Sequence, residues 1–305
     1  MSTPVTVLMA VYNGSRFLRT AIPSILDQTY RDFRFLIVDD ASTDDTRELI
    51  RSYPDDRIDL VRLEKNVGQT AALNVGLRRA DSSWIVRMDA DDFSAPDRVE
   101  EQMKAAEPHG DLGCVGTFAW EFSEDPTQRE RVVQRPVGEA GIRRGLLLGA
   151  PMIHGTMMIR REALLAIGGY NERYRYSQDR DLFNRLLTRY PGVNIPKPLL
   201  GIRRHREQGS YCSVAADENI EIFSQMLSES HYSLEEKTVI RQSLSFSYLF
   251  RAHCREGGKE YPQIVRDIGW AFRTSPATAL KSLVSFAIPK KARIALERIT
   301  QRNRP

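Results

Sequence analysis

The stretch SWIVRMDADDFSAPDRV, residues 83–99, joins a short apolar run, a cluster of carboxylates and a proline that can open a helix. The apolar run SWIV is typical of a strand that is buried on both faces. Asp89, Asp91 and Asp92 come directly after it, and residues 96–107 carry apolar side chains at helical spacing. A strand that leads through a short loop into a helix is the repeating unit of an α/β sheet.

The same alternation extends over the first 120 residues. Other apolar runs lie at residues 5–12, 33–40, 58–63 and 112–120, and amphipathic segments at 15–28, 43–52 and 69–79 lie between them. This pattern predicts an α/β fold with a mostly parallel central sheet flanked by helices. Residues 216–305 show long segments of 3.6-residue periodicity without strands, which predicts a helical C-terminal region.

Composition limits the class of protein. A chain of 305 residues with 41% hydrophobic content can form one large α/β domain with a helical extension. A net charge of +4 does not indicate nucleic-acid binding, and we expect no nucleic-acid partner. The cysteines (Cys114, Cys212 and Cys254) lack the spacing of a disulfide framework or a zinc site. Without a signal-like N-terminus or a run of about 18 apolar residues, we expect a cytoplasmic location.

Carboxylates follow two of the predicted strands. Asp39 and Asp40 end the run at 33–40, and Asp89 and Asp91, two residues apart in the other cluster, can converge on one point. In parallel α/β sheets, ligands bind at the carboxyl ends of the strands. Close carboxylates raise each other's pKa unless a cation lies between them, and their oxygens suit Mg²⁺ or Mn²⁺. Since Mg²⁺ often also binds substrate phosphates, the pattern favours a diphosphate ligand.

A simpler interpretation of the second cluster is that Asp92 or Ser94 caps the helix opened at Pro96.

Three segments resemble, in order and spacing, the family 2 glycosyltransferases with the GT-A fold of nucleotide-diphospho-sugar transferases. They are residues 5–46, which contain VDDASTD, NVGQTAALNVGL at 66–77 and MDADD at 88–92. The resemblance covers roughly residues 4–210. It implies a GT-A domain over residues 1–212, with a nucleotide-sugar half at about 1–120 and an acceptor half at about 121–212. Residues 213–305 would then form the helical extension.

By this resemblance, one group of residues would bind the nucleotide of a UDP, GDP or dTDP sugar: Ala10, Tyr12, Asn13, Asp39, Asp40, Asn66 and Gly68. Leu73 stands where the family often has an arginine, which removes one expected nucleotide contact. Asp89 and Asp91 resemble the DxD motif, which implies that both are metal ligands, with Asp91 the main one. Asp89 and Asp92 would also contact the donor. Arg203 and His205 match an Arg-x-His pattern that would meet the diphosphate and the metal, and we expect His205 to be a metal ligand.

A base for the reaction is predicted within YSQDRDLFNRLLTRY, residues 176–190. Asp179 shares a helical face with Leu182 and Phe183, which predicts that it points inward in the first turn of a helix. Asp181 lies four residues before Arg185, the spacing of a surface ion pair. Asp179 resembles the aspartate of the family's ED motif, the catalytic base in inverting members, with Gln178 in place of the usual glutamate. The alternative is that Asp179 is a buried helix cap with a lowered pKa.

His154, in HGTMMIRR, resembles the family segment that lines the acceptor side.

Together these patterns predict an inverting, Mn²⁺- or Mg²⁺-dependent glycosyltransferase. It would move a sugar to a hydroxyl of a glycan or lipid-linked acceptor in bacterial polysaccharide or glycolipid synthesis. A sugar nucleotidyltransferase could use the same acidic strand ends but would release pyrophosphate, and an inactive sugar-nucleotide-binding module could keep the fold. The chain has no Walker A loop, GxGxxG after a strand, HExxH or Gly-x-Ser-x-Gly, which excludes the commonest other enzyme classes.

The C-terminal segment at 281–304 combines an apolar patch with many basic residues: Lys281, Lys290, Lys291, Arg293, Arg298, Arg302 and Arg304. This composition is that of an interfacial helix attracted to anionic lipid, which predicts peripheral contact with the inner face of the membrane. The alternative is a solvated basic face of a helix that covers the core.

Overall fold

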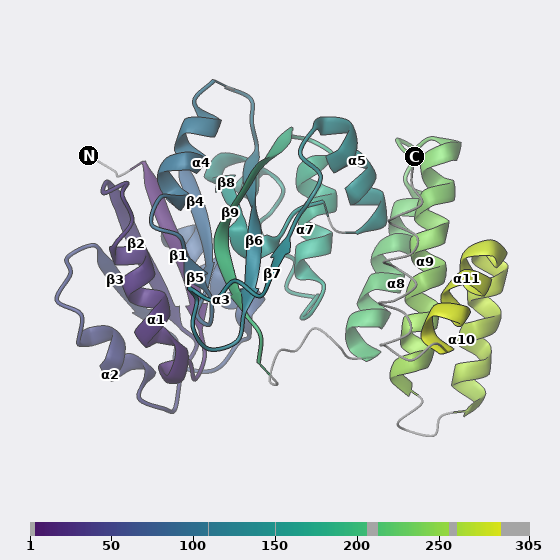
Figure 1. The fold of residues 1–305 in the computed structure, drawn as a ribbon, viewed down its shortest axis with the longest axis horizontal. Coiled ribbons are helices and arrows are strands. Elements are labelled where there is room, and N and C mark those ends of the chain that lie inside the picture. Colours follow the sequence, from purple (N-terminus) through teal and green to yellow (C-terminus); the bar gives the residue numbers. More distant parts are fainter. Residues whose placement is uncertain (1–3, 109, 150, 206–212, 256–260, 288–305) are drawn as a thin grey trace. The chain divides into compact units, whose positions relative to one another are not determined.

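The computed structural model describes residues 4–108, 110–149, 151–205, 213–255 and 261–287 (Figure 1). The chain divides into two compact units, Met1–Gln208 and Gly209–Pro305.

The first four strands of the N-terminal unit form a parallel sheet in the order β3-β2-β1-β4. Their bounds are β1 (Val5–Val11), β2 (Phe33–Asp39), β3 (Ile58–Arg62) and β4 (Trp84–Asp89). Val11 lies opposite Asp39 in the β1–β2 register, and Ala10 lies opposite Asp89 in the β1–β4 register. The register therefore brings both acidic strand ends to one edge of the sheet, as expected.

Helices cover both faces of this sheet because its strands are apolar on both sides. The helices are α1 (Ser15–Leu26), α2 (Thr46–Arg51), α3 (Gln69–Arg79) and α4 (Arg98–Ala106). Val7 of β1 belongs to one buried cluster with Leu18 of α1 and Val99 of α4. The next residue, Leu8, belongs to a second cluster with Leu73 of α3.

The second half of the unit adds antiparallel strands, so the complete nine-stranded sheet is mixed, in the order β3-β2-β1-β4-β8-β6-β9-β5 with β7 paired to β6. These strands are β5 (Phe93–Ser94), β6 (Cys114–Phe122), β7 (Arg131–Val133), β8 (Met158–Arg160) and β9 (Gly192–Arg203). The helices between them are α5 (Glu139–Leu148), η1 (His154–Thr156), α6 (Arg161–Ala166) and α7 (Gln178–Leu187). The pairing of β9 with β5 carries the end of β9 toward the acidic loop after β4.

Gln28, which follows α1, holds the segment after that loop in place. Its side chain is buried and donates to the carbonyl oxygens of Ser24 (2.9 Å) and Ala95 (2.7 Å) and to the hydroxyl of Ser94 (3.1 Å). It also accepts the backbone N–H of Val99 at 3.0 Å. The path from β4 into α4 is therefore fixed by a buried amide with well-placed partners.

The C-terminal unit consists of helices in its described residues: α8 (Ser213–Ser228), α9 (Leu234–Arg255), α10 (Tyr261–Thr274) and α11 (Pro276–Ala287). Arg251 of α9 pairs with Asp267 of α10, and Ser245 donates to the carbonyl oxygen of Ala271. In the part of the chain that the structure describes, no helix combines the length and apolar character needed to cross a membrane. Of the predicted lipid-facing segment, residues 288–304 lie outside the described residues.

Replacing Gln28 with alanine should destabilise the N-terminal unit, because the buried N–H of Val99 and the carbonyl oxygen of Ala95 lose their partner. We expect the free energy of unfolding to fall by about 1–3 kcal/mol. Urea unfolding followed by tryptophan fluorescence measures this change. The exposed Gln128→Ala is the matched control and should stay within about 0.5 kcal/mol of the parent chain. Equal losses for both variants would contradict the role given to Gln28.

Candidate functional site

A pocket of about 300 Å³ lies at the carboxyl ends of β1, β2 and β4. It brings together many of the predicted site residues: Ala10, Tyr12, Asn13, Asp40, Asp89, Asp91 and His205. Val11, in the loop expected to hold the nucleotide, also lines it. The lining further includes residues that the sequence analysis did not single out: Gly14, Phe17, Gln69 and Ala90. Such a concave site, with polar groups converging on a partly apolar wall, suits a small ligand.

Asn13 shapes one wall of the pocket. Its backbone adopts the left-handed conformation (φ 51°), and its side-chain oxygen accepts the backbone N–H of Thr43 at 2.8 Å. Its own N–H donates to the Ser42 hydroxyl at 2.9 Å. These bonds join the loop after β1 to the loop after β2 and leave the ring of Tyr12 half exposed at the pocket. Asn13 thus positions the wall, and Tyr12 presents a flat surface to a ligand.

Asp40 holds the loop that precedes α3. Its two carboxylate oxygens accept the backbone N–H groups of Val67 (2.7 Å) and Gly68 (2.8 Å), and its carbonyl oxygen accepts the Asn66 amide at 3.3 Å. Gly68 has φ 88°, a conformation that favours glycine. Asn66 and Gly68 therefore contact Asp40, which itself lines the pocket.

Asp39 is fully buried beside the pocket rather than in its lining. One of its carboxylate oxygens accepts the backbone N–H of Ser42 at 2.9 Å, and the other is buried without a hydrogen-bond partner. A buried acceptor without a partner is unfavourable, and a ligand hydroxyl or N–H could satisfy it. Leu73 is fully buried in the core.

The three aspartates after β4 have different surroundings. Burial opposes ionisation of Asp89, but the guanidinium of the buried Arg87 beside it lowers the pKa of Asp89 overall. Burial and the charge of Asp89 raise the pKa of Asp91. Asp92 is buried and accepts the backbone N–H of Arg203 at 3.1 Å, and burial together with Asp91 raises its pKa well above the usual range. The charges of Arg87, Arg98 and Arg203 reach Asp92, but they do not offset burial and the repulsion from the neighbouring aspartates.

Asp92 and Ser94 do not cap the following helix, since α4 begins at Arg98 after Asp97, without a side-chain capping bond.

His205 and Arg203 approach the acidic loop from β9 and the residues after it. The Nε2 atom of His205 lies 2.9 Å from a carboxylate oxygen of Asp91, and its Nδ1 atom is buried without a partner. Arg203 lies outside the pocket lining and donates to the carbonyl oxygens of Asp91 (2.9 Å) and Glu124 (2.9 Å). Arg203 thus binds the backbone of the acidic loop from outside the pocket, whereas His205 lines the pocket.

The side chains of Asp91 and His205 supply some of the ligands that a divalent cation needs. Asp91 supplies a carboxylate and His205 an imidazole in direct contact with it. Among the described residues, no group of three His, Cys, Asp or Glu side chains is arranged to hold a metal ion. A cation here would therefore take further ligands from a bound diphosphate or from a shift of Asp89, as Mg²⁺ sites commonly do with substrate phosphates.

Gln69 connects the pocket to the predicted base. Its amide nitrogen donates to Asp89 at 3.1 Å, and its amide oxygen accepts the side-chain N–H of Gln178 at 3.3 Å. The next residue, Asp179, lies outside the lining of the pocket, but the charge of Asp89 reaches it. Burial raises the pKa of the Asp179 carboxyl, and the neighbouring Arg180 partly offsets this. Gln69 thus bonds to Asp89 of the acidic cluster and to Gln178, and Asp179 is the residue after Gln178.

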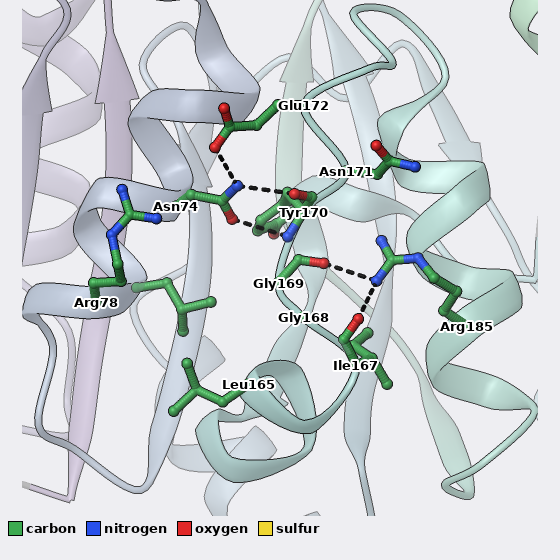
Figure 2. A pocket seen from close by; sticks show the side chains of 11 residues that line it. Asn74, Arg78, Leu165, Ile167, Gly168, Gly169, Tyr170, Asn171, Glu172 and Arg185 are labelled. Carbon is green, nitrogen blue, oxygen red and sulfur yellow. Dashed lines mark hydrogen bonds between the residues drawn. The ribbon is translucent and has the colours of Figure 1, made fainter.

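The segment that leads into α7 is attached to α3 by buried hydrogen bonds. Figure 2 shows that the Asn74 amide on α3 contacts the backbone of Tyr170 and the side chain of Glu172. Thr70 donates to the carbonyl oxygen of Tyr174 at 3.0 Å. The bonds of Asn74 border a second pocket of about 590 Å³. All of these bonds fix the start of α7 relative to Gln69.

The prediction that Asp181 forms a surface ion pair is wrong in one respect. The pair with Arg185 is present, but the Asp181 side chain is only 9% exposed. Arg185 also donates to the carbonyl oxygens of Ile167 (2.7 Å) and Gly169 (2.8 Å), as Figure 2 shows. The helical spacing gave the partner correctly, whereas burial depends on packing against the turn after α6, which spacing does not reveal.

His154 lies close enough to Asp89 for the two side chains to interact electrostatically. Its Nε2 atom is 2.9 Å from the Tyr170 hydroxyl, and burial together with Arg87 lowers its pKa to about 3. It is therefore neutral at physiological pH.

Comparison with known proteins agrees with this architecture. The family model Glycosyl transferase family 2 matches residues 6–168. The predicted glycosyltransferase EpsE of Bacillus subtilis (strain 168) is 36% identical over 65% of this chain and 72% of its own length. WbnJ of Escherichia coli, an O-antigen biosynthesis glycosyltransferase, is 30% identical over 69% of this chain and 84% of its own length.

A solved structure shares the fold. The mannosyltransferase PcManGT from Pyrobaculum calidifontis, solved with GDP-Man and Mn²⁺, is similar with a TM-score of 0.64 and 20% identity, over 96% of this chain and 83% of that one. This likeness confirms the fold class expected from the sequence. Because the family model matches more than half of this chain, the chain belongs to glycosyl transferase family 2.

Proposed function

We propose that this protein is an inverting glycosyltransferase that moves a sugar from a UDP, GDP or dTDP sugar to a hydroxyl of its acceptor. The observation that carries the proposal is the link from the pocket at the strand ends through Gln69 and Gln178 to Asp179. This link supports the proposal because transfer between two substrates requires a base close to the donor, and the carboxyl of Asp179, whose pKa is raised, follows Gln178.

The nucleotide would bind between β1 and β2. The half-exposed ring of Tyr12 can stack on the flat base, and the buried oxygen of Asp39 without a partner can accept a hydrogen bond from the base or the ribose. The diphosphate would then extend toward Asp89 and Asp91.

A divalent cation, Mn²⁺ or Mg²⁺, would be held by Asp91 and His205, with Asp89 next to them. When bound, it would neutralise the charge that develops on the departing diphosphate. Burial and the charge of Asp89 raise the pKa of Asp91, which disfavours its ionised form. A cation beside Asp91 would offset both effects, which supports this assignment. PcManGT, which shares the fold, was solved with Mn²⁺.

Asp179 would act as the base. As the acceptor hydroxyl oxygen bonds to the anomeric carbon, its proton passes to the Asp179 carboxylate. The bond from that carbon to the diphosphate oxygen breaks, and its electron pair leaves with the nucleoside diphosphate. Attack from the side opposite the leaving group inverts the configuration at the anomeric carbon.

The acceptor would be a glycan or a lipid-linked sugar, and the work of the enzyme would lie in bacterial polysaccharide or glycolipid synthesis on the cytoplasmic side. The relation to WbnJ supports this assignment. A nucleotidyltransferase working at the same acidic strand ends would release pyrophosphate, and an inactive module would release neither product. Two incubations with Mn²⁺ separate the three functions. From a panel of nucleotide sugars, only the glycosyltransferase releases nucleoside diphosphate, by slow donor hydrolysis. From nucleoside triphosphates mixed with sugar 1-phosphates, only the nucleotidyltransferase releases pyrophosphate.

Asp179→Asn should lower turnover by roughly 10²–10⁴-fold, because the amide cannot take the acceptor proton. Donor affinity should change little, since Asp179 lies outside the pocket lining. Nucleoside diphosphate release measures turnover, and calorimetry measures donor binding. The exposed Asp81→Asn is the control and should behave as the parent chain. Unchanged turnover in Asp179→Asn would remove the base assignment.

Arg180→Gln should shift the acidic limb of the pH–rate profile to higher pH. The Arg180 guanidinium lowers the pKa of Asp179 against the effect of burial, so its loss raises that pKa further. The base acts when it is ionised, and activity therefore falls at a higher pH as acid is added. Arg189→Gln, an exposed arginine just after α7, removes the same charge and should leave the limb in place. A shift of the limb to lower pH would contradict this.

Asp91→Asn should weaken Mn²⁺ binding by on the order of 10–100-fold or more, because a ligand carboxylate is lost. Calorimetry of donor binding with Mn²⁺ and with a chelator measures the effect. The parent chain should bind donor more tightly with Mn²⁺, and the variant should show a smaller difference. The exposed Asp125→Asn is the control. Equal donor affinity of the parent chain with and without metal would argue against a metal-dependent site.

A further inference from the structure

Helix α10 of the C-terminal unit exposes one face that combines apolar and basic side chains. Its exposed residues recur at helical spacing and define the α10 surface: Pro262, Val265, Arg266, Gly269, Trp270 and Arg273. Val265 is 69% exposed and Trp270 is 45% exposed. The following helix continues this composition, with Leu280 61% exposed and Lys281 beside it. Large apolar side chains exposed among basic ones mark a face that is suited to contact another surface.

Every charge exposed along this part of the chain is positive. The only acidic residue between positions 262 and 282 is Asp267, which is fully buried and binds Arg251 on the inner side of α10. Arg266 and Arg273, by contrast, are exposed. The α10 surface is therefore selective for an anionic partner.

The tryptophan is held in place on this surface. Its ring stacks on Tyr248 with centroids 6.2 Å apart and an angle of 18° between the planes. The Arg273 guanidinium lies 5.3 Å from the centre of the same ring. Trp270 thus combines a fixed, half-exposed ring with a neighbouring cation, an arrangement that suits the boundary between water and an apolar phase.

We propose that the α10 surface binds an anionic lipid bilayer in the interfacial plane, with Val265 and Trp270 at the boundary between headgroups and acyl chains and Arg266 and Arg273 against lipid phosphates. An amphipathic helix with tryptophan on its apolar face and arginines beside it binds membranes in this way. The contact lies upstream of residues 288–304. It does not depend on the catalytic roles proposed above.

Charge favours lipid over a second copy of the chain. In a symmetric dimer, the same face would meet itself, which would bring the basic side chains of both copies close together. Apolar side chains such as Val265 and Leu280 favour a membrane over a polyanion such as nucleic acid, which offers mostly charged and polar groups to them.

The test uses the full chain and vesicles of phosphatidylglycerol mixed with phosphatidylcholine, compared with phosphatidylcholine alone. The protein should sediment with the anionic vesicles, and less so as salt is added. Trp84 and Trp120 are 6% and 1% exposed, so Trp270 is the exposed tryptophan among the three in the chain. Its fluorescence should therefore shift to shorter wavelength when the protein binds anionic vesicles.

The double variant Arg266→Gln, Arg273→Gln should weaken partitioning roughly 20–30-fold, since each basic residue contributes about fivefold. Trp270→Ser should weaken it as well and remove the spectral shift. Matched controls on α9 are the exposed Arg241→Gln and Leu234→Ser, which should bind as the parent chain does. Circular dichroism melting of each variant shows whether it is folded.

Several results would overturn the proposal. These are a parent chain that does not bind anionic vesicles, equal binding to phosphatidylcholine alone, and binding that survives loss of both arginines. If the Trp270 fluorescence shifts with protein concentration in samples without lipid, and sedimentation velocity shows a dimer, the α10 surface binds a second copy of the chain instead. Asp179→Asn should bind vesicles normally, so a failure of the catalytic proposal and a failure of this one are distinguishable.

Discussion

The repulsion among carboxylates at the end of β4 is the constraint on which the site depends. Asp89 tolerates burial because the guanidinium of Arg87, itself buried within the same strand, pairs with it. Asp91 and Asp92 have weaker compensation, and the pKa of each is raised. A site of this kind is tuned for a positively charged or metal-bound ligand, because such a ligand removes the unfavourable interaction.

Helix α3 gives this cluster its connection to Asp179. At its start Gln69 bonds to Asp89 and Gln178, and farther along Thr70 and Asn74 hold the segment that leads into α7. Neutral amides are well suited to this position, since a carboxylate at residue 178 would add another negative charge near Asp89 and Asp179. The replacement of glutamate by Gln178 therefore keeps the hydrogen-bonded link without increasing the repulsion.

The two units supply different parts of the proposed activity. The N-terminal unit holds the pocket proposed for the donor and the proposed base, and the C-terminal unit offers a basic surface with a fixed tryptophan. If the acceptor is linked to lipid, binding at a membrane would raise its local concentration and reduce the search to two dimensions. The chemistry and the location of the enzyme can thus be tested by independent variants.

The sequence by itself determined the α/β class, the strands ending in Asp39 and Asp89 and the family, because these follow from local hydrophobic patterns and from segments with fixed spacing. The family resemblance also gave most of the pocket lining, and parallel strands explain why the acidic ends at Asp40 and Asp89 meet at one edge. Only the tertiary structure decided that Arg203 supports the acidic loop, that Gln69 joins Asp89 to Gln178, and that the Asp181–Arg185 pair is largely buried. Each of these depends on contacts between segments distant in sequence or on burial, and neither residue type nor spacing specifies which side chains meet once the elements pack.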